Sequence, residues 1–286
     1  MDNLKAKKRH PEEIAVYTAI YVCAAFSVLQ LLGIIIYVFA KGARRVNWAF
    51  LTGVTSILHG TVGIAGNILN TLIIILLTMI ITTPIGVGAA IYLNEYAKPG
   101  KLVTVIIFAT ETLAGIPSII FGLFGMLFFG QLCHMGYSLL TGSLTLTLMV
   151  LPLVTRNTQE ALKTVPDSFR TGAVGLGAGK WYTIRTILLP SAMPGIVTGV
   201  ILAIGRIIGE SAALLFTAGS AHLLPKTFNA FLEKIFHSGG TLTIQLYLSA
   251  SKGEFEVAFG IAVVLLVIVL LINFGTKRLA KKLEKH

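Results

Sequence analysis

Long apolar segments constrain the fold of this chain more than any other feature of its sequence. Six stretches are apolar over the roughly 20 residues that a helix needs to cross a bilayer: residues 14–40, 68–93, 103–130, 138–158, 196–218 and 257–275. Hydrophobic residues make up 55% of the 286 residues and charged residues only 12%, so one soluble core cannot hide the apolar surface. The sequence therefore predicts an all-α, polytopic membrane protein with six transmembrane helices.

Prolines and glycines indicate that two of these segments are not straight rods. The second segment carries Pro84 together with Gly86 and Gly88, which predict a bend and close contacts with a neighbouring helix. The third segment is interrupted near its middle by GIPS at residues 115–118. This interruption predicts two half-helices.

The positive charge of the chain is distributed as in a membrane protein. The net charge is +11, but the Lys and Arg residues cluster at the two ends and in one central stretch, which indicates membrane orientation and not nucleic-acid binding. With the N-terminus inside, sixteen of them fall on the inner side and six on the outer side, so both termini are predicted to be cytoplasmic. The first apolar run exceeds the roughly 7–15 residues of a signal-peptide core, and we expect it to be a retained span.

The segments between the spans are expected to be tails and loops. The cytoplasmic tails are expected at 1–13 and 276–286, and a long inner loop at about 156–190. The first span and the outer loop that follows it occupy 14–66. An outer loop at 219–256 is rich in Leu and Phe, and we expect it to be partly helical and packed at the membrane face. Cys23 and Cys133 are expected to be unpaired thiols.

A glycine-rich stretch, AVGLGAGKWYT at residues 173–183, has the look of a phosphate-binding loop. Its Gly-Lys pair is Gly179 and Lys180, but Val174 stands where the P-loop pattern needs its first glycine. Trp181 follows the lysine where the pattern needs Ser or Thr, and no strand signal precedes the stretch. The nucleotide-binding interpretation is therefore rejected.

Helix rules explain these glycines better. PDS at residues 166–168 is a helix start, and the helix is predicted to run to about Leu176. Gly177 then supplies the left-handed conformation that ends a helix. A second helix is predicted from about residue 180 to Pro190, so the inner loop contains a helix, a glycine turn and a helix.

The spacing of this loop resembles a known motif. Permease subunits of binding-protein-dependent ABC importers carry Glu-Ala-Ala, three residues, Gly, nine residues and Ile-x-Leu-Pro there. In this chain Gly177 is followed after nine residues by ILLP at 187–190, while TGA at 171–173 replaces the usual EAA. The resemblance implies that the loop sits in a groove of a cytoplasmic ATPase. It assigns this contact to Thr171, Gly172, Ala173, Leu176, Gly177, Ile187, Leu189 and Pro190.

Three further stretches narrow the resemblance. GVGAAIYLNEY (86–96), GIPSIIFGLFG (115–125) and TGVILAIGRIIGESAALLFTAG (198–219) are similar to phosphate-importer permeases of the PstA type, from about residue 67 to the end. The resemblance implies a type I ABC importer permease architecture with a permease core at 67–275, in the lipid of a bacterial cytoplasmic membrane. It implies one half of a phosphate pathway, with neither a catalytic site nor a cofactor of its own. The implied partners are an ABC ATPase dimer that uses ATP, a second permease subunit and an extracytoplasmic phosphate-binding protein.

Apart from Arg156, an expected interface anchor at the inner end of the fourth segment, three charged residues fall inside the apolar segments. Arg206 lies ten residues into the fifth segment, and Glu210 follows at i+4 on the same face of the predicted helix. A charge at mid-membrane costs about 2.5–3.5 kcal/mol, so it faces a partner or a water-filled path. Either the two ions satisfy each other, or Arg206 offers its planar fork to a crossing anion while Glu210 holds it. Glu111 in the third segment is a second candidate partner for Arg206, or a carboxyl near the inner interface.

Other functions remain as alternatives. Arginine alone does not separate phosphate from sulfate or molybdate. An ion channel is a different class, although it has no use for an elaborate inner loop. An intramembrane enzyme and a metal site are unsupported, because none of the six histidines lies in a span or has ligand spacing.

Overall fold

The helices of the bundle follow the apolar segments of the sequence. The computed structural model describes residues 11–56, 61–225 and 227–283. In this part of the chain five helices are long and apolar enough to cross a membrane, and the count rises to six when a bent pair is taken as one span. The five are α1 (Pro11–Gly42), α3 (Ala65–Ile91), α6 (Leu139–Lys163), α9 (Leu189–Gly209) and α13 (Phe255–Leu283). The prediction of an all-α polytopic membrane protein is confirmed, with one short hairpin as an addition.

The third predicted span consists of two half-helices, as the sequence indicates. α4 (Lys101–Gly115) is followed by α5 (Ser118–Gly125), which continues as the π-helical turn η3 (Met126–Leu132), and the pair is bent by 103°. Ile116 is extended, with ψ 132°, directly before Pro117. Because proline clashes with a helical residue in front of it, the chain leaves the helix at this point.

The fifth helix begins earlier than the predicted boundary at residue 196. α8 (Lys180–Thr183), the π-helical turn η4 (Ile184–Leu188) and α9 form one helix from Lys180 to Gly209. Pro190 lies inside this long helix, directly after the π-helical turn η4, and it does not end the helix.

The same span is broken before its predicted end at residue 218. α9 stops at Gly209, Glu210 is extended with ψ 126°, and the separate short helix α10 (Ala212–Thr217) follows. The Glu210 carboxylate accepts a hydrogen bond of 3.1 Å from the amide of Ala213 and so caps the start of α10. The prediction of one continuous span at 196–218 is therefore wrong.

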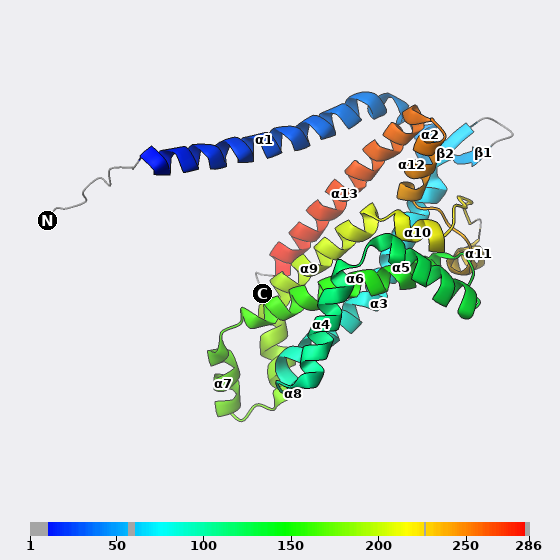
Figure 1. The fold of residues 1–286 in the computed structure, drawn as a ribbon. Helices are drawn as coiled ribbons and strands as arrows, with labels where there is room; N and C mark the ends of the chain where they lie inside the picture. Colours follow the sequence, from blue (N-terminus) through cyan, green and yellow to red (C-terminus); the bar gives the residue numbers. More distant parts are fainter. Residues whose placement is uncertain (1–10, 57–60, 226, 284–286) are drawn as a thin grey trace.

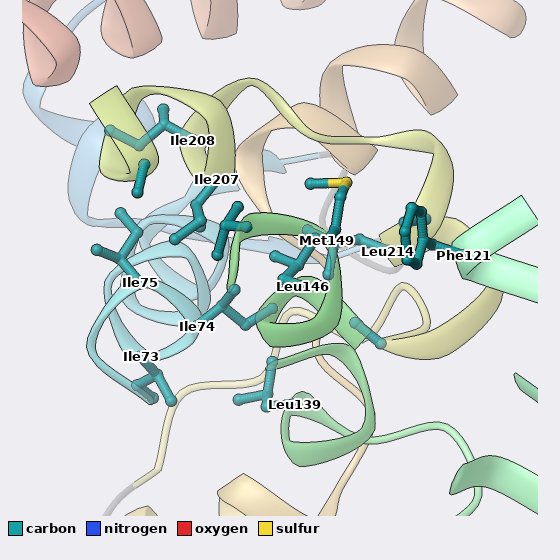
Figure 2. Close-up of a cluster of buried hydrophobic side chains, with 14 of the residues drawn as sticks. Ile73, Ile74, Ile75, Phe121, Leu139, Leu146, Met149, Ile207, Ile208 and Leu214 are labelled. Atoms are coloured by element: carbon teal, nitrogen blue, oxygen red, sulfur yellow. The ribbon is translucent and has the colours of Figure 1, made fainter. Parts of the chain in front are cut away.

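The core lies around α6, the most buried of the long helices, which packs against α3 and α9 on one side and α5 and α10 on the other. Leu146 and Met149 of α6 share one buried cluster with Ile74 of α3 and Ile207 of α9 (Figure 2). Because lipid is as apolar as these side chains, van der Waals packing between the helices stabilises such a cluster in a bilayer. Dense packing around one central helix gives the other helices fixed positions.

The glycines of α3 only partly behave as the sequence predicts. A Cβ atom on Gly86 would lie 2.9 Å from Cγ1 of Val154 on α6, so this glycine permits the predicted close helix contact. Around Gly88 no described atom lies within 4 Å of such a Cβ. The predicted close contact is therefore confirmed for Gly86 and wrong for Gly88.

α1 stands apart from the rest of the bundle. It meets α13 near its own C-terminal end, where the rings of Tyr37 and Phe259 are 5.7 Å apart, and the two helices then diverge (Figure 1). Large apolar side chains such as Tyr21 and Phe26 are exposed along α1. This surface is left for lipid or for another membrane subunit to cover.

Short elements gather at the end of the bundle where α1 and α13 meet (Figure 1). They are η1 (Ala43–Arg45), α2 (Trp48–Thr52), the antiparallel strands β1 (Val54–Ser56) and β2 (Thr61–Ile64), α11 (Phe228–Glu233), η5 (Lys234–Phe236) and α12 (Leu242–Ser251). The prediction that loop 219–256 is partly helical is confirmed.

The N-terminal end of α3 holds this loop. The side-chain amide of Asn67 donates to the carbonyl oxygen of Gly240 at 2.9 Å, and that of Asn70 donates to Gly240 and to Ala221, both at 3.0 Å. Both asparagines are buried. Because a buried amide without partners costs about 1–3 kcal/mol, these bonds fix the loop to α3.

Candidate functional site

Two short helices, α7 (Asp167–Gly175) and α8, project from the end of the bundle opposite the hairpin, which we call the α7 end (Figure 1). Gly177 has a positive φ of 79°, the left-handed conformation predicted for it. Its amide donates to Val174 at 2.9 Å, and the amide of Ala178 donates to Ala173 at 3.0 Å. These two bonds form a Schellman motif that ends α7 and turns the chain towards α8.

Apolar side chains at this turn face outward. Val174, Leu176, Trp181 and Tyr182 form what we call the α7–α8 apex, and all four are exposed. Leu176 is 91% exposed, so packing within this chain does not explain an apolar side chain at this position. Several exposed apolar side chains on one projecting element are typical of a protein interaction site.

The other residues assigned by the resemblance lie on both sides of the turn. Thr171, Gly172, Gly177 and Pro190 are exposed, Ile187 and Leu189 are half-buried, and Ala173 is buried. Ala173 attaches α7 to the bundle, and Ile187 and Leu189 attach the helix that follows it. The exposed residues of this set are free of contacts that would occupy their surface within the described chain. Their contact with an ATPase stays a prediction.

Arg170 is the residue of this region that the sequence analysis missed. Its guanidinium donates to the Glu95 carboxylate at 2.9 Å, to Asp167 at 2.9 Å, and to the carbonyl oxygens of Val165 and Leu162, each at 3.0 Å. The pKa of Arg170 is raised, chiefly by the hydrogen bond to Glu95. The two ions are 75 residues apart in the sequence, and no motif spacing links them.

Arg206 lies on an exposed stripe of α9. Thr198, Leu202, Gly205, Arg206 and Gly209 are exposed at helical spacing, and we call them the α9 stripe. The opposite face, with Ala203 and Ile207, is buried in the core. The stripe therefore points out of this chain and is available to solvent, substrate or another subunit.

The structure does not pair the intramembrane charges as predicted. Because α9 ends at Gly209, Glu210 does not lie on a helical face shared with Arg206, and its carboxylate caps α10. Among the described residues, no ion pair joins Arg206 to Glu210 or to Glu111. Glu111 is exposed on α4, and none of the fifteen described residues of α4 is buried. Arg206 is thus a cation without a partner in the part of the chain that the structure describes.

The fold is shared with solved importer permeases. A chain of a bacterial alginate ABC transporter matches with a TM-score of 0.68 at 17% identity, over 94% of this chain and 96% of that one. A chain of the MetNI methionine ABC transporter matches with a TM-score of 0.58 at 21% identity, over 77% and 94%. The bundle with its projecting helix pair is therefore a permease fold, the type I ABC importer architecture that the sequence predicts.

The family follows from sequence comparison. The chain belongs to the binding-protein-dependent transport system inner membrane component family, whose model matches residues 82–286. The probable ABC transporter permease protein YqgI of Bacillus subtilis is 35% identical over 92% of this chain and 93% of its own length. The phosphate transport system permease protein PstA of Xylella fastidiosa (strain Temecula1) is 34% identical over 96% and 94%.

Proposed function

We propose that this chain is one of two permease subunits of an ATP-driven phosphate importer. The observation that carries the proposal is the unpartnered Arg206 on the α9 stripe, next to the break between α9 and α10. Broken helices near a charged residue are the usual setting of substrate sites in transporters. The similarity to PstA proteins over nearly the whole chain supports phosphate as the substrate.

Arg206 suits the passage of an anion. It lies in the last turn of α9, where the helix dipole favours a positive charge. Its planar guanidinium donates two hydrogen bonds to two oxygens of one phosphate. A second permease facing the α9 stripe would enclose the path, so that the anion crosses between the two subunits.

The exposed surfaces support the proposed partners. The α7–α8 apex would dock in a groove of one subunit of an ATPase dimer, and that ATPase would bind and hydrolyse the ATP. The α7 end would then face the cytoplasm, with both termini on the same side. An extracytoplasmic phosphate-binding protein would deliver its cargo at the opposite end, where the hairpin, α11 and α12 gather. Glu111, exposed on α4, is kept as a candidate residue of the path.

Uptake by the assembled complex in proteoliposomes tests the substrate. We expect ATP-dependent accumulation of labelled phosphate, with sulfate and molybdate at background. Sulfate or molybdate uptake without phosphate uptake would replace phosphate by that oxyanion. An ionic current without ATP would indicate a channel and overturn the proposal as a whole.

The Arg206→Gln variant tests the site. We expect phosphate uptake to fall at least about ten-fold, because a hydrogen bond to a charged group contributes about 1.5–3 kcal/mol. Arg156→Gln is the matched control, since Arg156 is also exposed but lies on α6 and is not part of the α9 stripe. Normal phosphate uptake by the Arg206 variant would remove this residue from the path.

A further inference from the structure

The interaction between Arg170 and Glu95 joins two segments that the chain does not connect directly. Arg170 lies on α7, and Glu95 lies in η2 (Tyr92–Tyr96), the π-helical turn that ends α3. The same guanidinium also donates to Leu162 and Val165 at the end of α6. One side chain therefore ties the projecting helix to the ends of two core helices.

The contact with Glu95 differs from an ordinary surface ion pair. The Glu95 side chain is 9% exposed and the Arg170 side chain 23%, whereas the Asp167 carboxylate on the other side of the arginine is 91% exposed. Exposed pairs contribute about 0–1 kcal/mol, but removing one partner of a buried pair leaves an uncompensated charge. Rearranging the Glu95 side of the arginine is therefore much more costly than rearranging the Asp167 side.

A second contact reaches the same turn from the other short helix. The ammonium group of Lys180, at the start of α8, lies 4.7 Å from the centre of the Tyr96 ring. This distance is within the range of a cation–π interaction. Both helices that flank the apex are thus attached to η2, through neighbouring residues.

We propose that Arg170 and Glu95 are positioning residues that make α7 move together with α3. The inference rests on the proposed function, in which the apex follows an ATPase. The covalent connections of α7 and α8 lead to α6 and α9, and without the ion pair a displacement of α7 would reach α3 only indirectly, through the packing of α3 against α6 and α9 and through the contact of Lys180 with Tyr96. With the pair in place it reaches α3 directly, and the far end of α3 holds the loop 219–241 through Asn67 and Asn70.

Coupling measurements on the full complex test this role. We expect Glu95→Gln and Arg170→Gln each to lower phosphate uptake per ATP hydrolysed by about two- to thirty-fold while the ATPase stays bound. The double variant is expected to be no worse than either single variant, because the two residues act as one unit. Arg170→Lys keeps the charge but not the forked geometry, so we expect it to lie between wild type and Arg170→Gln.

Asp167→Asn is the matched control. It removes the exposed partner of the same arginine, and we expect coupling to stay at the wild-type value. Unchanged uptake per ATP in Glu95→Gln, or a double variant with the product of both single defects, would overturn the inference.

A distance measurement separates this inference from the proposed function, since it requires no transported substrate. Spin labels at Ser168 on α7, outside the apex, and at Tyr92 in η2, both exposed, are introduced with Cys23 and Cys133 replaced by serine. We expect one narrow distance in the nucleotide-free and ATP-bound complexes, and a broad distribution once Glu95→Gln is added. A distance that stays narrow in the variant would overturn the positioning role, whatever the complex transports.

Discussion

Gly177 is the residue on which the shape of the α7 end depends. Its positive φ is unfavourable for any residue with a Cβ atom, although no described atom would touch that Cβ. The restriction is therefore in the backbone and not in the packing. This is why its role could be predicted from a single glycine following a helix pattern.

Replacing Gly177 by valine is expected to weaken the ATPase contact. A β-branched residue in the left-handed region costs about 1–2 kcal/mol, so the Schellman turn would open and the apex would lose its fixed position. Copurification of the ATPase with the permease measures the effect. Gly175→Ala is the control, because Gly175 is the last residue of α7, has ordinary backbone angles and has free space around it. Wild-type ATPase association of the valine variant would contradict the docking assignment of this loop.

The charged residues show where single-residue reasoning stops. A charge inside an apolar segment marked Arg206 as important, and its exposure on α9 is consistent with that interpretation. Glu210 was predicted as the partner of Arg206 from helical periodicity, and this argument fails because the helix ends at Gly209. The bond between Arg170 and Glu95 is a tertiary contact, so neither spacing nor composition could reveal it.

At the scale of elements, the sequence was most informative about helices and least about where they break. The proline of GIPS at residues 115–118 predicts the bend between α4 and α5. Between α9 and α10 the break has no proline; the Glu210 side chain caps the new helix, and the Thr243 hydroxyl donates to the Glu210 carbonyl oxygen at 2.8 Å. Such a break depends on contacts made after the helices have packed.

A glycine permits a close approach between α5 and α10. A Cβ atom on Gly122 would lie 2.8 Å from the Cα atom of Ala213, and backbone cannot move aside as a flexible side chain can. Gly122→Ala is expected to destabilise the protein by about 1–3 kcal/mol through overpacking. Thermal unfolding in detergent measures the shift.

Gly33→Ala provides the comparison for this variant. Gly33 lies within α1 with no described atom within 4 Å of an added Cβ, so alanine there is expected to be neutral or slightly stabilising. Equal melting temperatures for the two variants would show that α5 and α10 separate easily in the folded protein.

At the scale of the whole molecule, the structure has two functional ends joined by long helices. The α7 end carries the apex, and the other end carries the hairpin, α11 and α12 (Figure 1). The excess of Lys and Arg near the α7 end predicts that this end is cytoplasmic. Residues 1–10 and 284–286, which hold part of that charge, lie outside the described residues.

Side-specific labelling checks this orientation. Single cysteines at Leu176 and at Leu223, which are 91% and 71% exposed, are expected to react with a membrane-impermeant maleimide from opposite sides of the membrane. Leu176→Cys should react only in inside-out vesicles, and less when the ATPase is bound. Labelling of both positions from the same side would refute the two-ended arrangement.

The bond between Arg170 and Glu95 has a consequence for exchanging parts between related permeases. A loop covering 164–179 looks like a self-contained cassette, since it begins after one helix and ends before another. Arg170 of this loop, however, needs the carboxylate of Glu95 as its acceptor, and Glu95 lies in a separate segment of the chain. A chimera that receives the loop alone would carry a docking helix without its anchor, so the smallest transplantable unit is two segments and not one.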